Sequence, residues 1–159
     1  MKKLLLLVGL ISLPTFASVS ANVSFASDYI WRGMTQSDGP AIQGGFDYEA
    51  ESGFYAGIWG SNVNFNDGAG SELDYYFGYG FELGSVGVDL GYVAFDYPDN
   101  TEGLDFEEIV VGLSYGDLGL TFALGQDGAP DYTEVAYSVA GIDFAYGEYD
   151  EYGNNFIIS

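Results

Sequence analysis

The sequence of 159 residues contains no cysteine and no histidine, and its three basic residues are Lys2, Lys3 and Arg32. Without cysteine the chain has no disulfide and no thiolate, and without either residue it has no Cys/His zinc site. The same absences exclude the Ser-His and Cys-His arrangements of nucleophilic enzymes. Because nothing else in the sequence meets the requirements of an active site, we expect no enzymatic activity and no cofactor.

Acidic residues dominate the charge of the chain, with 24 Asp and Glu and a formal net charge of −21. A nucleic-acid-binding face requires clustered Lys and Arg, so nucleic acid is excluded as a natural partner. Hydrophobic residues nevertheless make up 48% of the chain and aromatic residues 18%. A disordered acidic chain carries far fewer aromatic residues, so the sequence predicts a folded protein with much apolar surface to bury or to place in lipid.

The first 21 residues have the layout of a secretory signal peptide. Two lysines precede an apolar run over residues 4–13, and small residues follow up to Ala21. The run is too short to cross a bilayer as a helix. We predict cleavage before Asn22, with cleavage before Ser18 as the second choice, and a single exported domain over residues 22–159.

Apolar and polar residues alternate along most of the remaining chain. In the segment LDYYFGYGFEL, residues 73–83, the odd positions are large and apolar, whereas the even positions are mostly Gly, Asp or Glu. A period of two is typical of β-strands, and its slip at residues 93–95 predicts a β-bulge. The pattern predicts nine strands and a short tenth segment: 23–32, 41–50, 54–65, 72–83, 86–96, 105–115, 118–125, 132–139, 142–149 and 156–158.

The predicted connections alternate in length. Short turns over 51–53, 84–85, 116–117 and 140–141 separate longer loops over 33–40, 66–71, 97–104, 126–131 and 150–155. Outer-membrane barrels combine tight turns at one end with longer loops at the other, whereas Greek-key sandwiches have no reason to alternate so regularly. We therefore predict an all-β fold, an antiparallel up-and-down barrel of the outer-membrane type with about eight to ten strands.

Alternation alone is also compatible with a soluble β-sandwich or half-barrel whose apolar face is the core. The polar face favours the barrel because it is rich in Gly and Ala and almost free of Lys and Arg. The apolar face is rich in Tyr and Phe, and we expect Trp31 and Trp59 to lie at the membrane interface. The expected location is the outer membrane of a Gram-negative-type bacterium, with lipid as a partner, and the alternative is the periplasm.

The stretch SDYIWRGMTQSDGPAIQGGFDYE, followed by SGFYAGIWGSNVNF, resembles the TorF-type family of bacterial porins, also known as Gcw_chp proteins of unknown function. The resemblance implies an outer-membrane barrel and a porin with more strands than this chain contains. It therefore implies that this chain is part of a larger barrel, or that one predicted strand is not a strand. The matching positions are Ser27, Asp28, Tyr29, Arg32, Gly33, Gln36, Ser37, Gly45 to Tyr48, Tyr55, Gly57, Trp59, Ser61 to Val63 and Glu72 to Tyr79.

Many acidic residues fall on the polar face of the predicted strands, which makes the expected lumen acidic. Because carboxylates in a channel favour cations, we predict passage of small cations or of small cationic and neutral solutes. The alternative is a non-conducting protein that acts in structure or binds ligands or ions through its long loops. The oxygen-rich stretch NFNDGAGSE lacks EF-hand spacing and is expected to be a hairpin loop rather than a calcium site. The candidate lumen residues are Asp28, Arg32, Asp47, Asp74, Glu82, Asp89 and Glu108.

Arg32 is the one basic residue outside the predicted leader. Its position predicts a place on the polar face near the outer end of the first strand, with Trp31 facing lipid. A buried group of carboxylates needs a counter-charge, and the planar guanidinium can serve several of them. We expect Arg32 to stabilise the fold by pairing with Asp28, Asp47 or Asp74, rather than to contact solute.

Overall fold

The computed structural model describes residues 18–66, 68–98 and 103–158. Within this part of the chain all regular structure is β, and no helix is long and apolar enough to span a membrane. The strands are β1 Ser18–Ala26, β2 Ile30–Trp31, β3 Met34–Thr35, β4 Ala41–Glu49, β5 Phe54–Asn62, β6 Ser71–Leu83, β7 Val86–Asp96, β8 Phe106–Tyr115, β9 Leu118–Gly125, β10 Tyr132–Val139, β11 Ile142–Tyr149 and β12 Gly153–Ile158.

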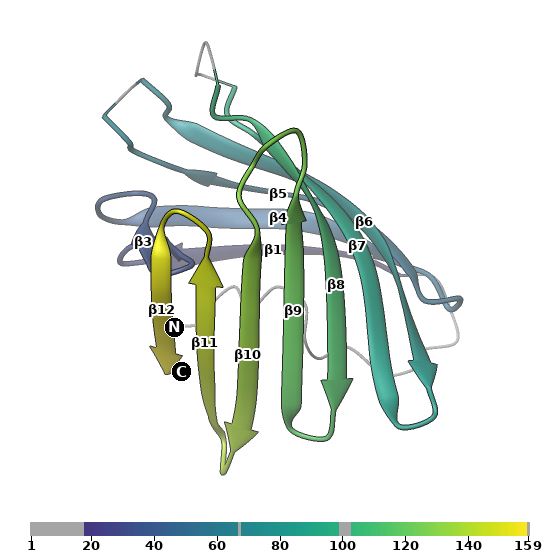
Figure 1. Ribbon diagram of the computed structural model, residues 1–159. Helices are drawn as coiled ribbons and strands as arrows, with labels where there is room; N and C mark the ends of the chain where they lie inside the picture. The colour runs from purple at the N-terminus through teal and green to yellow at the C-terminus, as the bar shows by residue number, and fades with distance from the viewer. Residues whose placement is uncertain (1–17, 67, 99–102, 159) are drawn as a thin grey trace.

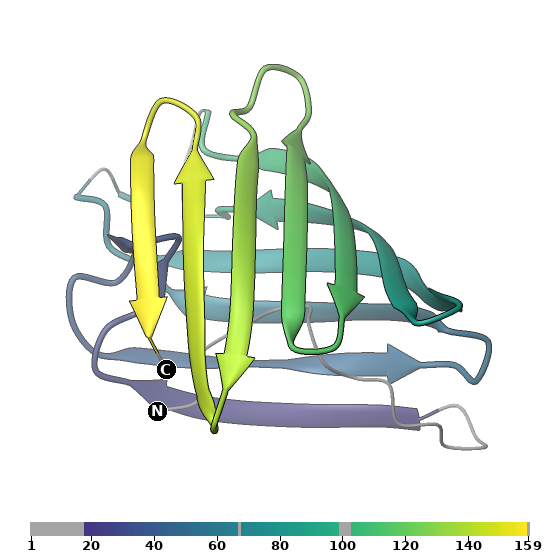
Figure 2. The same cartoon turned by 60° about the horizontal axis from the view of Figure 1, so that its bottom comes forward.

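Ten of these strands form one antiparallel sheet in the order β1-β4-β5-β6-β7-β8-β9-β10-β11-β12. Each long strand pairs with the next one along the chain, so the predicted all-β, antiparallel up-and-down fold is confirmed. The sheet curls until its C-terminal strands run crosswise to β1, β4 and β5 (Figures 1 and 2). Among the described residues, β1 and β12 do not pair with each other, so these ten strands form a strongly curved open sheet.

The alternation of apolar and polar residues predicted the positions of most strands correctly. The predicted strands over 86–96, 118–125, 132–139 and 142–149 coincide with β7, β9, β10 and β11. The predicted bulge at residues 93–95 is wrong, because β7 keeps an unbroken register with both β6 and β8. The slip instead marks the point where the side chains on one face of β7 change from small or acidic to large, at Val93 and Phe95.

The predicted first strand over 23–32 is also wrong. β1 ends at Ala26, and the next residues form a separate hairpin in which β2 pairs with β3. Arg32 and Gly33 are its two-residue turn, with φ of 48° and 83°. Positive φ at both positions is the requirement of a type I′ turn, which costs little for Gly33 but strains Arg32. Arg32 therefore lies in a turn rather than on the first strand.

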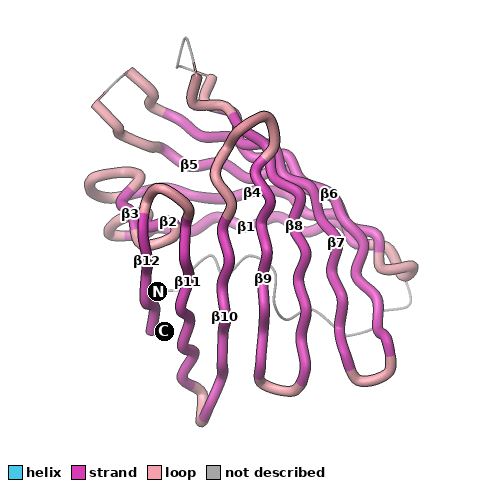
Figure 3. The backbone as a smooth tube through the Cα atoms, in the orientation of Figure 1, coloured by secondary structure: helices cyan, strands magenta, loops and turns pink. Residues whose placement is uncertain are grey.

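The connections of the long strands alternate in length, as predicted, except for the last one, over residues 150–152. Short links over 50–53, 84–85, 116–117 and 140–141 lie at one end of the sheet, and the longer ones lie at the other (Figure 3). The last connection is shorter than expected, because β12 begins at Gly153 rather than near residue 156. The β2–β3 hairpin belongs to the long-loop end.

The convex face of the sheet is apolar. Alternate side chains along the long strands point outward, and many of them are exposed, among them Phe25 at 80%, Phe46 at 62% and Phe77 at 52%. The opposite, concave face carries most glycines and carboxylates of the strands, and its packed residues lie towards the long-loop end. This arrangement reverses that of a soluble protein, in which large apolar side chains turn inward.

The concave core consists of two neighbouring groups. One contains Tyr29, Trp59 and Phe95, and the other contains Val110, Tyr132 and Tyr149. Trp31 packs against both, since its ring contacts Phe95, Phe106 and Tyr149. The β2–β3 hairpin thus lies inside the curved sheet and joins its two halves.

Candidate functional site

Arg32 and Glu108 form a buried ion pair on the concave face. The turn of the β2–β3 hairpin presents the arginine, and β8 presents the glutamate, 76 positions later in the sequence. Arg32 Nη1 donates to Glu108 Oε1 at 2.6 Å and Nη2 donates to Oε2 at 2.7 Å. The side chains are 10% and 1% exposed. A bidentate pair of this kind is among the strongest polar contacts that a protein makes.

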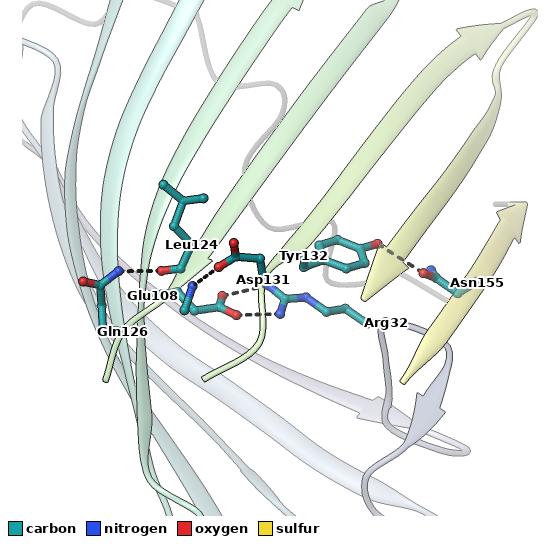
Figure 4. A network of polar contacts seen from close by, with 8 residues as sticks. Arg32, Glu108, Leu124, Gln126, Asp131, Tyr132 and Asn155 are labelled. Atoms are coloured by element: carbon teal, nitrogen blue, oxygen red, sulfur yellow. Dashed lines mark hydrogen bonds and ion pairs between the residues drawn. The ribbon is translucent and has the colours of Figure 1, made fainter. Parts of the chain in front are cut away.

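Three aromatic rings surround the guanidinium group. The Arg32 Cζ atom lies 4.1 Å from the ring centre of Trp31, 4.2 Å from that of Tyr132 and 4.9 Å from that of Tyr149. Figure 4 shows the Tyr132 ring beside the guanidinium, with the Asn155 side chain beyond it. Cation–π attraction adds to the ion pair in such a site. The cage compensates for the strained backbone of Arg32 and fixes the hairpin against β10, β11 and β8.

The predicted partners of Arg32 were wrong, because the arginine pairs with Glu108 rather than with Asp28, Asp47 or Asp74. The predicted interface positions of the two tryptophans were wrong as well. Trp59 lies on the concave face at 6% exposure, in edge contact with Tyr29. Trp31 belongs to the aromatic cage.

Asp47 and Asp89 each accept a hydrogen bond from a tyrosine two strands away. Each tyrosine ring passes over a glycine of the strand that lies between. The Tyr55 hydroxyl donates to Asp89 Oδ1 at 2.8 Å, and the ring passes over Gly78, where an added Cβ would meet the hydroxyl at 2.2 Å. The Tyr76 hydroxyl reaches Asp47 in the same way, over Gly57. Glycine on the concave face therefore makes room for a tyrosine to bridge two strands.

The other predicted lumen residues lie apart from Arg32. Asp28 accepts hydrogen bonds from the Thr35 hydroxyl at 2.6 Å and the Ser37 hydroxyl at 3.1 Å, so it stabilises the base of the β2–β3 hairpin. The hydrogen bond from Thr35 lowers the pKa of the Asp28 carboxyl, and that from Ser37 contributes to the shift. Glu82 lies exposed near the short-turn end of β6.

Asp74 lies in a second buried acidic site, which it shares with Glu72. Both side chains come from the concave face of β6, and they are 5% and 2% exposed. The Tyr29 hydroxyl donates to Glu72 Oε1 at 2.8 Å, and the Tyr97 hydroxyl also bonds to Glu72. Burial raises the pKa of both tyrosines, and the charges of Glu72 and Asp74 raise it further, so both hydroxyls remain protonated donors.

A recess of about 860 Å³ opens beside the cage at the long-loop end. Aromatic side chains form much of its wall, including Trp31, Phe95 and Phe106, and loop residues such as Asp105 and Gln126 complete it. Its size is within the range of small-molecule sites. Among the described residues, no group of three or more acidic side chains is arranged to hold a metal ion together.

Sequence reasoning missed Glu72 and the tyrosines of both buried sites. The spacing of Glu72 and Asp74 by two residues places them on one face of a strand, and this was a usable signal. No local signal pairs Arg32 with Glu108, because the curvature of the whole sheet brings them together.

Comparisons with known proteins add one match. A family model described as a bacterial protein of unknown function (Gcw_chp) matches residues 14–156. No curated protein and no solved structure matches the chain.

Proposed function

Because the chain belongs to the Gcw_chp family of bacterial proteins of unknown function, whose description names no activity, we propose its function from its geometry. The protein is an outer-membrane porin of the TorF type. It passes small cations, or small cationic and neutral solutes, along the acidic concave side of its sheet. The long loops face the exterior and the short turns face the periplasm.

The observation that carries this proposal is the apolar convex face. Large apolar side chains such as Phe46 on β4, Phe77 on β6 and Phe122 on β9 are exposed across the ten-stranded sheet. A soluble monomer rarely exposes a contiguous apolar patch larger than a few hundred Å². Lipid contact removes the cost of this exposure and leaves the acids on the side that faces water.

The start of β1 overlaps the predicted leader, so the choice of cleavage site decides how much of this strand remains. β1 includes Ser18 to Ala21, which pair with β4. Cleavage of the leader before Ser18 keeps β1 whole, whereas cleavage before Asn22 removes four of its residues. The residues before Ser18 lie outside the described part of the chain.

A second candidate function is a non-conducting outer-membrane protein that binds ligands through its loops. The packed interior favours it, since the β2–β3 hairpin and its aromatic contacts occupy the concave side at the long-loop end. The open recess beside the cage suits ligand binding at that end.

Cell fractionation and conductance test the proposal. The full chain, expressed with its leader, is expected in the detergent-extracted outer membrane, and recovery in the soluble periplasmic fraction would exclude the membrane assignment. In planar bilayers the purified protein is expected to give discrete conductance steps and a cation-selective reversal potential in a KCl gradient. Membrane insertion without any steps would favour the non-conducting alternative.

Two double variants test which face of the sheet determines the ion selectivity. Asp47→Asn with Asp89→Asn removes two charges from the concave face and is expected to reduce cation preference. Glu107→Gln with Glu148→Gln removes two charges from the exposed convex positions and is expected to leave it unchanged. Equal effects of the two pairs would contradict an ion path along the concave face.

A further inference from the structure

Two buried carboxylates of the concave face lack a counter-charge from the residues that the structure describes. Glu72 and Asp74 are separated by two residues on β6, so their side chains share one face. Each has one carboxylate oxygen, Glu72 Oε2 and Asp74 Oδ1, that is buried without a hydrogen-bond partner among the described residues. Buried polar atoms are nearly always paired, so two orphaned oxygens on neighbouring acids require an explanation.

The groups around these acids also present oxygen. Tyr29 and Tyr97 hydrogen-bond to Glu72 through their hydroxyl groups. Ser61 is buried at 7% exposure, pairs with Glu72 between β5 and β6, and donates its hydroxyl hydrogen to the Asn62 carbonyl at 3.0 Å. Its oxygen lone pairs therefore remain acceptors.

No protein cation reaches this site in the described part of the chain. Arg32 is the one basic residue there, and both of its terminal nitrogens bind Glu108. A buried charge without a partner is unfavourable, and two adjacent like charges are more so. The pair must therefore take up a cation or a proton.

We infer that Glu72 and Asp74 bind a hard cation such as Ca²⁺ through their two unpaired oxygens, with the hydroxyl oxygens of Tyr29 and Ser61 as two further ligands. An all-oxygen set suits Ca²⁺, Mg²⁺ or Na⁺ and does not suit softer metals. Two carboxylates with neutral oxygens neutralise one divalent ion, so no third acid is needed.

This inference rests on the proposed acidic interior but not on conduction. The bound ion occupies a position on the proposed ion path, beside the aromatic core and close to the hairpin. The inference can fail while conductance is found, and binding can be present in a protein that does not conduct.

Calcium titration of the full chain tests the site. The protein is purified in neutral detergent, stripped with a chelator, and titrated calorimetrically with CaCl₂, with MgCl₂ in a parallel run. We expect one saturable Ca²⁺ site that is at least about tenfold tighter than the background of exposed carboxylates, together with a higher unfolding temperature in Ca²⁺. The absence of a saturable site would overturn the inference.

Substitutions test whether Glu72 and Asp74 form the tight Ca²⁺ site. Glu72→Gln with Asp74→Asn is expected to abolish the tight site, and Glu107→Gln with Glu148→Gln, which removes the same charge from the convex face, is expected to retain it. Heat-modifiable gel mobility shows whether the double variant folds. If it does not fold, the single variant Asp74→Asn replaces it in the test, because this substitution leaves the Tyr29–Glu72 hydrogen bond in place. Retention of the tight site in a folded Asp74→Asn variant contradicts the inference.

Infrared spectroscopy distinguishes a cation from a proton. If the pair holds a proton, the metal-free and Ca²⁺-treated proteins show the same carbonyl band of a protonated carboxylic acid, and Glu72→Gln with Asp74→Asn removes it. If the pair binds Ca²⁺, addition of the ion eliminates any such band from the wild-type protein. A band that persists at saturating Ca²⁺ overturns the inference.

Discussion

The concave face contains two buried acidic sites that differ in one respect. Glu108 has a cation, because Arg32 binds both of its oxygens within a cage of three rings. Glu72 and Asp74 have none among the described residues, and Glu72 instead accepts hydrogen bonds from the Tyr29 and Tyr97 hydroxyl groups. A chain with one arginine in its described part can neutralise one buried acid internally, so the second site requires a cation or a proton from solution.

The largest effect is expected from Arg32→Met. The substitution leaves Glu108 buried and unpaired, and breaking a buried pair in this way costs about 3–5 kcal/mol. It also releases the β2–β3 hairpin from its cage. Denaturant unfolding in detergent micelles, with Glu82→Gln at an exposed position as the control, measures the change. A loss no larger than that of the control would show that the ion pair does not stabilise the fold.

A smaller loss is expected from Arg32→Lys. Lysine keeps the charge but loses the planar fork and the stacking on Trp31 and Tyr132. The loss of one charged hydrogen bond corresponds to about 1.5–3 kcal/mol. The same unfolding measurement applies, and a stability equal to that of the wild type would mean that charge alone holds the hairpin.

In the presence of chelator, neutral substitutions at the two sites are expected to change the unfolding midpoint differently. Glu108→Gln leaves Arg32 without its charge partner and should lower the unfolding midpoint. Glu72→Gln with Asp74→Asn removes two like charges that lack a cation and should leave the midpoint unchanged or raise it. Added Ca²⁺ should then raise the midpoint of the wild type above that of the double variant. Losses of the same sign and size in chelator would remove the distinction between the sites.

The smallest effect is expected from Tyr55→Phe, away from both sites. The ring still covers Gly78, and only the hydrogen bond to Asp89 is lost, which corresponds to about 0.5–1.5 kcal/mol. The unfolding midpoint should fall slightly. A loss as large as that of Arg32→Met would show that the tyrosine bridges, rather than the ion pair, determine the stability of the concave face.

The strands were predictable because a period of two and tight Gly-containing turns are local properties of the sequence. The β2–β3 hairpin was not, because Tyr29 and Trp31 continue the alternation of β1 although the chain reverses at Arg32. The sequence also did not determine which face of its strand Trp59 occupies. Its strand has large residues on both faces, with Phe54 and Ile58 on one and Tyr55 and Trp59 on the other.

The candidate site was predictable in part. Asp74 and Glu108 were identified from their place on the polar face, and both are buried there. The pairing of Arg32 with Glu108 depends on the curl of the entire sheet, which no short segment determines. Likewise, Tyr97 reaches Glu72 from the connection after β7, and its position in that loop gave no periodic signal.

The central claim is that the convex face contacts lipid and the concave face does not. Quenching of tryptophan fluorescence by brominated lipid tests it directly, because Trp59, at 6% exposure, and Trp31 both lie on the concave side, whereas Phe77 is 52% exposed on the convex side. In proteoliposomes we expect little quenching of the wild type and strong quenching of the additional emission of the Phe77→Trp variant. Strong quenching of the wild type, or none of the added emission, would contradict the account.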